Sequence, residues 1–151
     1  MNYNEIRRKT KEIKVGGLII GGNAPVSVQS MTNTSSTDYD ALYRQIKSLE
    51  AAGCDLVRVA IPDMEAVRVL SKIKESDIKI PISADIHFDY KLAIAAAEGG
   101  ASKIRINPGN IGGPDKIKAV VEKAFLFMWA KGLFRIEGEM EIAFIYIRIS
   151  I

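Results

Sequence analysis

Four apolar runs, each followed by a stretch with helical periodicity, set the strongest limit on how this chain folds. The runs begin near residues 26, 55, 80 and 103, so they recur after 29, 25 and 23 residues. Repeats of this length are typical of parallel strands joined by crossover helices. The expected strands are Val26–Met31, Leu56–Ile61, Ile80–Asp85 and Lys103–Asn107. The sequence therefore predicts an α/β protein whose parallel sheet is covered by helices.

The segments between these runs carry residues that start and stop helices. Thr37 is expected to cap the first helix, with Asp40 three residues further on as its capping-box partner. Gly53 is placed to end that helix in a left-handed conformation. Pro114 is expected at the first position of the fourth helix, where its missing N–H costs no hydrogen bond. The second and third helices are expected at residues 63–75 and 89–98.

A short hairpin is expected before the first of these units. Glu12–Val15 and Leu18–Ile20 are strand-like and flank Gly16-Gly17. A pair of glycines suits the positive φ angles of a two-residue turn. The expected architecture is thus a hairpin followed by four βα units.

Composition narrows the class of protein. With 151 residues, 48% hydrophobic and 26% charged, the chain is expected to form one soluble globular domain. Its apolar runs are far shorter than the roughly 18–20 residues of a membrane-spanning helix. No apolar signal segment opens the chain, so a cytoplasmic protein without a membrane partner is expected. One cysteine, Cys54, allows no internal disulfide and is expected to be a small buried side chain.

The net charge of +3 comes entirely from the first 14 residues, because the other 137 carry 16 basic and 16 acidic side chains. A nucleic-acid-binding domain needs a basic face, which this distribution does not provide. The basic segment is therefore interpreted as a solvated arm, and no nucleic-acid partner is expected.

Polar residues stand at or near the carboxyl ends of the predicted strands, where parallel α/β proteins bind their ligands. Because the strands are parallel, we expect these side chains to lie along one rim. The candidate substrate-binding residues are Arg58, Asp85, His87, Arg105 and Asn107. No catalytic residue and no metal ligand is assigned among them.

Arg58 and Arg105 lie inside apolar strands, where an unpaired guanidinium is costly. A bound diphosphate or carboxylate suits the planar donor fork of arginine. An ion pair with Asp85 or Asp55 satisfies the same need, so both interpretations stay open from the residues alone.

His87 follows Asp85 by two residues, which places both on the same side of a strand. A carboxylate there orients an imidazole for acid–base chemistry. The alternative is that Asp89 caps the next helix and His87 fills a loop. The glycine-rich turn at residues 107–113 likewise either offers backbone amides to a phosphate or is simply a turn.

The character of the sequence changes after residue 124. From Phe125 onward 18 of 27 residues are apolar, and six of the eleven aromatic residues lie there. This segment has neither a clean helical nor a clean strand period. It is expected to pack on the open sheet as a helix or an added strand. The predicted division is a partial barrel at residues 1–124 and an apolar tail at 125–151.

Four sequence blocks resemble one known family, the 4-hydroxy-3-methylbut-2-enyl diphosphate synthases of the methylerythritol phosphate route to isoprenoids. The blocks are VQSMTNT (28–34), AGCDLVRV (52–59), ADIHFDY (84–90) and KIRINPGNIG (103–112). They occur in the family's order, and the resemblance covers residues 7–124. It implies the first half of a TIM-type (β/α)8 barrel, which four βα units do not close.

The resemblance also implies a function. The family reduces 2-C-methyl-D-erythritol 2,4-cyclodiphosphate to 4-hydroxy-3-methylbut-2-enyl diphosphate in a two-electron step that releases water. Electrons reach a [4Fe–4S] cluster from ferredoxin or flavodoxin, and the cluster domain of one protomer closes over the barrel of its homodimer partner. The five candidate residues match family positions that hold the cyclic diphosphate: Arg58, Asp85, His87, Arg105 and Asn107.

The chain departs from the family after residue 124, because the further barrel strands and the cluster cysteines are missing. No cluster is therefore expected on this chain, and the chain alone is expected to be inactive. One hypothesis is a truncated or frameshifted enzyme that still supplies the substrate cup. Another is a non-catalytic fragment, either decayed or complemented by a separate chain. A pterin- or aldolase-like phosphate-binding barrel is the enzymatic runner-up, which the four blocks disfavour.

Overall fold

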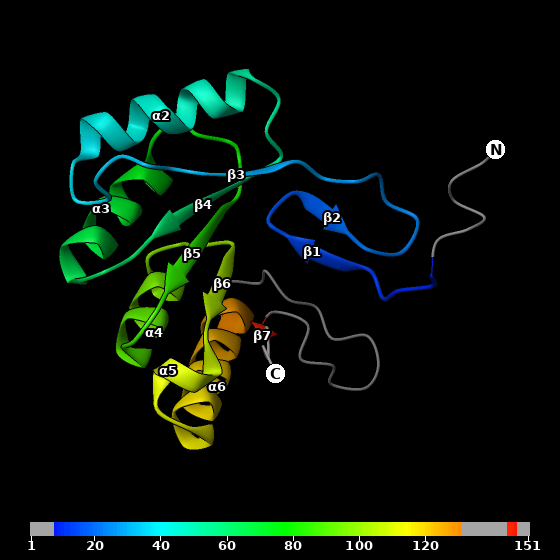
Figure 1. The fold of residues 1–151 in the computed structure, drawn as a ribbon, viewed down its shortest axis with the longest axis vertical. Helices are drawn as coiled ribbons and strands as arrows, with labels where there is room; N and C mark the ends of the chain where they lie inside the picture. The colour runs from blue at the N-terminus through cyan, green and yellow to red at the C-terminus, as the bar shows by residue number, and fades with distance from the viewer. Residues whose placement is uncertain (1–7, 131–144, 148–151) are drawn as a thin grey trace.

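The computed structural model describes residues 8–130 and 145–147, and these residues form two sheets and a layer of helices (Figure 1). The larger sheet has five parallel strands in the order β3-β4-β5-β6-β7. Its strands are β3 (Gln29–Met31), β4 (Leu56–Ala60), β5 (Ile82–Ile86), β6 (Lys103–Ile106) and β7 (Ile145–Ile147). The helices are α2 (Tyr39–Ala51), α3 (Met64–Glu75), α4 (Tyr90–Glu98), α5 (Pro108–Ile111) and α6 (Pro114–Ala130). Each strand thus pairs with the next one along the chain, as in an opened TIM barrel.

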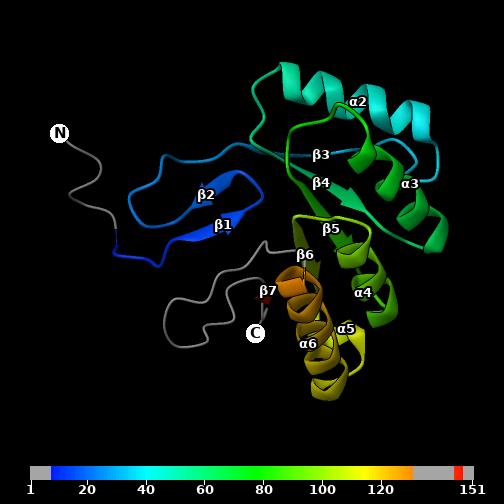
Figure 2. The ribbon, with the colours of Figure 1, turned by 180° about the vertical axis from the view of Figure 1, so that it is seen from behind.

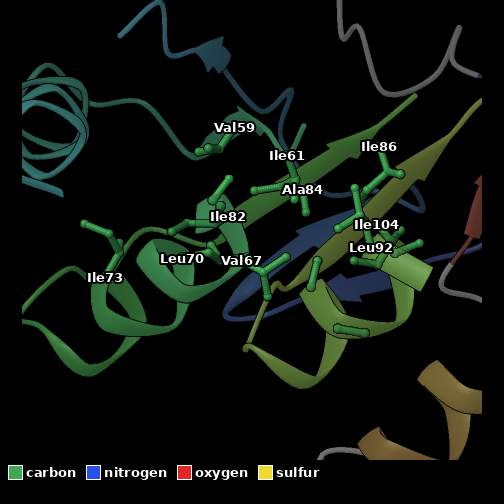
Figure 3. Packing of buried hydrophobic residues seen from close by; sticks show 14 of the residues in the cluster. Val59, Ile61, Val67, Leu70, Ile73, Ile82, Ala84, Ile86, Leu92 and Ile104 are labelled. Atoms are coloured by element: carbon green, nitrogen blue, oxygen red, sulfur yellow. The ribbon is translucent and has the colours of Figure 1, made fainter. Parts of the chain in front are cut away.

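The helices line one face of the sheet, and the hydrophobic core lies between the two layers (Figures 1 and 2). Alternate strand residues point into this core because successive side chains of a strand face opposite sides. Those on the helix side are Val57, Val59, Ile82, Ala84, Ile104 and Ile106. They belong to the same cluster as Leu70 and Ile73 of α3 and Leu92 of α4 (Figure 3). The predicted α/β half-barrel is confirmed, and the polar residues between these positions are left to the opposite face.

The predicted hairpin is present as β1 (Ile13–Val15) and β2 (Leu18–Ile20), paired antiparallel. Gly16 adopts a φ of +60° in the turn, a conformation that favours glycine. A Cβ on Gly16 would also lie 3.2 Å from Pro81 Cβ and 3.3 Å from Ser102 Oγ. Pro81 and Ser102 directly precede β5 and β6, so the hairpin turn packs against the amino-terminal ends of these strands.

The predicted cap of the first helix is wrong by one residue. Asp38, not Thr37, is the N-cap of α2, and its side chain accepts a hydrogen bond from Ala41 N at 3.0 Å. The Thr37 hydroxyl instead lies 2.8 Å from the Ser35 hydroxyl. A carboxylate near a helix N-terminus gains from the helix dipole as well as from the hydrogen bond, which favours aspartate here. The prediction for Gly53 is confirmed, since its φ is +83° directly after the helix.

The apolar tail contributes to both layers within the described residues. Helix α6 continues without interruption from Pro114 to Ala130, across residue 124. Strand β7 then pairs in parallel with β6, with Arg105 opposite Tyr146. The expected sheet of four strands therefore has a fifth, and the tail supplies it as the added strand. The rest of the tail lies outside the described residues.

The opposite edge of the sheet is open in the described part of the chain, since β3 pairs only with β4. Val26 and Val28, which lead into β3, are 83% and 59% exposed. Uncovered strand edges with apolar side chains pair with other chains.

We expect the protein to self-associate with increasing concentration, and size-exclusion chromatography with light scattering measures this. We expect Val26→Lys/Val28→Lys to shift the population toward monomer; a wild-type monomer with a sharp melting transition would contradict the expectation.

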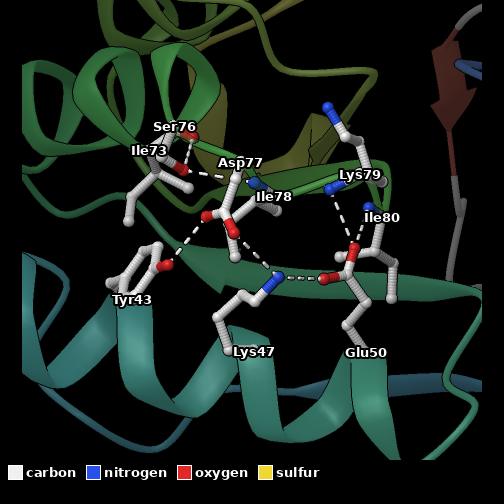
Figure 4. A network of polar contacts seen from close by, with 9 residues as sticks. All are labelled: Tyr43, Lys47, Glu50, Ile73, Ser76, Asp77, Ile78, Lys79 and Ile80. Carbon is white, nitrogen blue, oxygen red and sulfur yellow. Dashed lines mark hydrogen bonds and ion pairs between the residues drawn. The ribbon is translucent and has the colours of Figure 1, made fainter.

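A polar network fastens the loop before β5 to helix α2 (Figure 4). Glu50 Oε1 accepts hydrogen bonds from the backbone N–H groups of Lys79 and Ile80, both at 2.8 Å. Lys47 Nζ lies 3.0 Å from Glu50 Oε2 and 3.3 Å from Asp77 Oδ2. Burial alone raises the pKa of Glu50, but Lys47 and the two amides outweigh it and lower that pKa.

The lowered pKa of Glu50 predicts a pH-dependent contribution to stability. The charged form contributes above the ordinary value of 4.5, and the contribution is lost as the pH falls through the lower folded-state pKa. We expect Glu50→Gln to reduce the free energy of unfolding at pH 7 by about 1–2 kcal/mol. Urea unfolding at pH 7 and pH 4 measures both effects. Glu75→Gln, at the exposed end of α3, is the control, and an equal loss at both pH values would contradict the assignment.

Candidate functional site

The face of the sheet opposite the helices carries charged side chains from three neighbouring strands. In the register of the sheet, Arg58 of β4 lies opposite Ser83 of β5, and Asp85 of β5 lies opposite Arg105 of β6. These residues alternate with the core positions, so they share the face away from the helices. The predicted convergence of Arg58, Asp85 and Arg105 is therefore present in the structure.

Asp85 is the centre of this group and has no exposed surface. Arg58 donates from Nε to Asp85 Oδ2 at 2.8 Å, and its Nη2 lies 2.6 Å from the same oxygen. Arg105 donates from Nη1 to Asp85 Oδ1 at 2.6 Å. Both carboxylate oxygens are occupied, which explains how a fully buried charge is tolerated. Of the two ion-pair partners considered from the sequence, Asp85 is correct, while Asp55 accepts from Val28 N at 2.7 Å.

The ion pairs leave positive charge and donors unused. Each guanidinium has five N–H donors, and Asp85 engages a minority of them. Within the described residues the remaining donors of Arg58 and Arg105 meet no protein acceptor. Their side chains are 26% and 30% exposed, so a ligand on this face can reach them. The ion pair and an anion site are thus compatible rather than exclusive.

Lys103 adds a third cation that the sequence analysis did not single out. It lies opposite Ser83 in the register, on the same face as Arg105, which is two residues further along β6. Burial, followed by the charges of Arg105 and Arg58, lowers the pKa of Lys103. The signal available in the sequence was its two-residue spacing from Arg105. Arg58 and Arg105 share one buried carboxylate, and this leaves an excess of positive charge that favours an anionic ligand.

His87 lies beyond the end of β5 at the same rim, and its side chain is 49% exposed. Its Nε2 is 3.8 Å from Asp85 Oδ2, which is longer than a hydrogen bond. Asp89 accepts from Lys91 N at 2.9 Å as the N-cap of α4, as one of the two sequence interpretations held. The structure therefore places His87 beside the ion-pair cluster and assigns Asp89 to capping.

Asn107 has a local role that sequence reasoning did not anticipate. Its side chain caps α5 by accepting from Gly109 N at 3.0 Å, and its carbonyl accepts from the amides of Asn110 and Ile111. These three amides are thus already bonded and do not form a cradle for a phosphate. Asn107 itself is exposed at the rim, two residues after Arg105.

A cluster site with several thiolate ligands does not fit the residues of this chain. Iron–sulfur clusters are held mainly by cysteine thiolates, and the sequence has one cysteine. Cys54 is half-buried just before β4, and its thiol contacts the carbonyls of Leu56 and Val28 at 3.2 and 3.5 Å. That position is at the amino-terminal end of the strand, away from the rim. In the described segments no group of three or more acidic, histidine or cysteine side chains is arranged to hold a metal ion.

Comparison with known proteins agrees with the fold. The GcpE TIM-barrel domain matches residues 10–127, which is most of the chain. The chain belongs to the GcpE family. The matched residues include the four strands β3 to β6 and all five candidate site residues.

Curated relatives of this GcpE chain include proteins named 4-hydroxy-3-methylbut-2-en-1-yl diphosphate synthase (flavodoxin). The protein from Caldicellulosiruptor saccharolyticus is 57% identical over 115 residues, which cover 76% of this chain and 33% of that protein. The protein from Halalkalibacterium halodurans is 58% identical over 118 residues, covering 78% and 32%. The chain thus spans about a third of the length of these relatives. No helix in the described part of the chain has the length and apolarity to cross a membrane.

Proposed function

We propose that this chain binds the diphosphate of 2-C-methyl-D-erythritol 2,4-cyclodiphosphate on the open face of its sheet. The observation that carries the proposal is the pair of guanidinium groups, Arg58 and Arg105, around the buried Asp85. Two guanidinium groups against one carboxylate leave a net positive charge, which an anionic diphosphate complements. Planar guanidinium donors match phosphate oxygens in geometry as well as charge.

The residues of this chain act by binding and orienting the substrate in the proposed reaction. The whole reaction adds two electrons and two protons to the cyclic diphosphate and releases water and 4-hydroxy-3-methylbut-2-enyl diphosphate. The relatives' name indicates flavodoxin as the source of the electrons. Arg58 and Arg105 hold the diphosphate, and His87 and Asn107 border it at the rim. The homodimer belongs to the same proposal and rests on the family resemblance, and a cytoplasmic location is proposed with it.

Isothermal titration of the full 151-residue chain with the cyclic diphosphate tests the proposal. We expect saturable binding that weakens as salt is added, because the site is electrostatic. Methylerythritol without phosphate is the control ligand, and we expect it not to bind. Equal binding of both compounds, or binding of neither, would contradict a diphosphate site.

A second prediction concerns redox activity. One cysteine does not supply the several thiolates that a [4Fe–4S] cluster requires, so we expect no cluster and no reductive activity from this chain alone. Anaerobic reconstitution followed by iron and sulfide analysis measures the cluster, and turnover with reduced flavodoxin measures the activity. Stoichiometric cluster together with turnover would refute this expectation.

A further inference from the structure

The loop that follows β3 is fastened to helix α2 by a single side chain. Gln45 Oε1 accepts hydrogen bonds from Asn33 N at 3.0 Å, Thr34 N at 3.1 Å and Thr34 Oγ1 at 2.8 Å. Gln45 Nε2 donates in turn to Asn33 Oδ1. One amide side chain thus engages four polar atoms of two adjacent loop residues.

These contacts determine which way the Asn33 amide faces. A backbone N–H only donates, so the two amides require the oxygen of Gln45 on their side and leave its NH2 group for Asn33. An NH2 group needs an acceptor, so the Asn33 atom bonded to it is the oxygen. The Asn33 NH2 group is therefore turned away from Gln45. Asn33 is exposed, and its NH2 group has no acceptor among residues 8–130 and 145–147.

The same loop starts beside the backbone of Arg58. Met31 at the end of β3 lies opposite Arg58 in the register, and Thr32 N donates to the Arg58 carbonyl at 3.0 Å. Thr32 is 7% exposed, so this attachment is buried. Asn33 follows directly, two residues after the end of β3, and so lies at the carboxyl-terminal rim of the sheet. The start of the loop, residues 32–34, is thus held at two points, by the backbone of Arg58 and by the side chain of Gln45.

We infer that Gln45 is a positioning residue that presents the Asn33 NH2 group to the anion bound by Arg58 and Arg105. The inference rests on the proposed function, because it needs a diphosphate on this face. A neutral donor complements the guanidinium groups by bonding a phosphate oxygen without adding further charge. Gln45 itself does not touch the ligand; it lies on the helix behind the loop.

A change of Gln45 to glutamate isolates this effect. The carboxylate of Gln45→Glu still accepts from both backbone amides, so the loop stays attached. Its second oxygen also accepts, which turns the Asn33 amide around and directs the Asn33 oxygen toward the anion. We expect binding of inorganic pyrophosphate to weaken about tenfold, as for loss of one hydrogen bond to a charged group. Asn33→Ala removes the donor directly, and we expect a similar loss.

The double variant Gln45→Glu/Asn33→Ala is expected to bind no more weakly than Asn33→Ala, because both changes remove one interaction. Ser48→Glu places the same charge on an exposed position of α2 one turn away, and we expect its affinity to equal the wild type. Hydrogen exchange at Asn33 and Thr34 checks that the loop stays attached in Gln45→Glu. The side-chain NH2 resonance of Asn33 is expected to shift on pyrophosphate titration in the wild type only.

The outcomes separate this inference from the proposed function. Wild-type binding together with unchanged affinity in Gln45→Glu and Asn33→Ala would overturn the role of Gln45 and leave the anion site intact. Additive losses in the double variant would also overturn it. A wild-type chain that binds neither pyrophosphate nor the cyclic diphosphate would overturn the proposed function, and this inference with it.

Discussion

Replacement of Asp85 by alanine is expected to lower the free energy of unfolding by about 3 kcal/mol, at the lower end for a broken buried ion pair. Asp85 is completely buried and bonded to Arg58 and Arg105 from the two neighbouring strands. Without it, two guanidiniums face each other with no counter-charge and β4, β5 and β6 lose a shared contact. The partial exposure of both arginines limits the loss, since water reaches them.

Urea unfolding monitored by circular dichroism measures this loss. Asp40→Ala, on the exposed first turn of α2, is the matched control and is expected to change stability far less. In the Arg58→Met background the same Asp85→Ala change is expected to cost less, because one of its partners is already gone. Equal costs in both backgrounds would show that Asp85 acts independently of the pair.

The second large effect is expected on ligand binding. In a full-length relative, Met at the position matching Arg58 or Arg105 is expected to weaken binding of the cyclic diphosphate by about 2–5 kcal/mol, as for removal of one partner of a buried charged contact. Each arginine has donors that Asp85 does not use, and these are the donors available to phosphate. Titration calorimetry below the unfolding temperature measures the change.

The arginine variants also affect Asp85, so stability has to be measured beside affinity. Lysine at either position keeps the charge but loses the planar fork, and we expect an intermediate affinity. Unchanged affinity in both Met variants, with reduced stability, would mean that the arginines serve only as structural partners of Asp85. Reduced affinity without loss of fold would establish them as ligand contacts.

Much of the fold followed from patterns that are local in the sequence. The rhythm of apolar runs predicted the parallel strands, and Gly16 and Gly53 marked a turn and a helix end because few other residues adopt positive φ. The carboxyl ends of parallel strands meet at one rim, so the meeting of Arg58, Asp85 and Arg105 followed as well. The roles of all five candidate residues toward a substrate stay predictions.

Other features depended on contacts between distant segments. Gln45 reads as an ordinary polar residue of a helix, and its loop partners lie 11 and 12 residues away. The two-residue spacing of Lys103 from Arg105 was visible in the sequence, but its nearness to Arg58 depends on the register of the sheet. The tail has no clean period, so the sequence did not show where β7 would pair. In the structure β7 pairs with β6, at the edge of the sheet that the four predicted strands leave open.

The sequence alone determined the order of strands and helices, the covered face of the sheet and the charged residues of the open face, since these depend on periodicity and chain direction. Only the tertiary structure decided which aspartate side chain forms the ion pairs with the two arginines. Asp85 and Asp55 were equivalent candidates in the sequence, but the register brings Asp85 between both guanidiniums and leaves Asp55 to Val28 N. An ion pair across strands forms where side chains of the same face come within hydrogen-bond distance, and that distance is a property of the sheet.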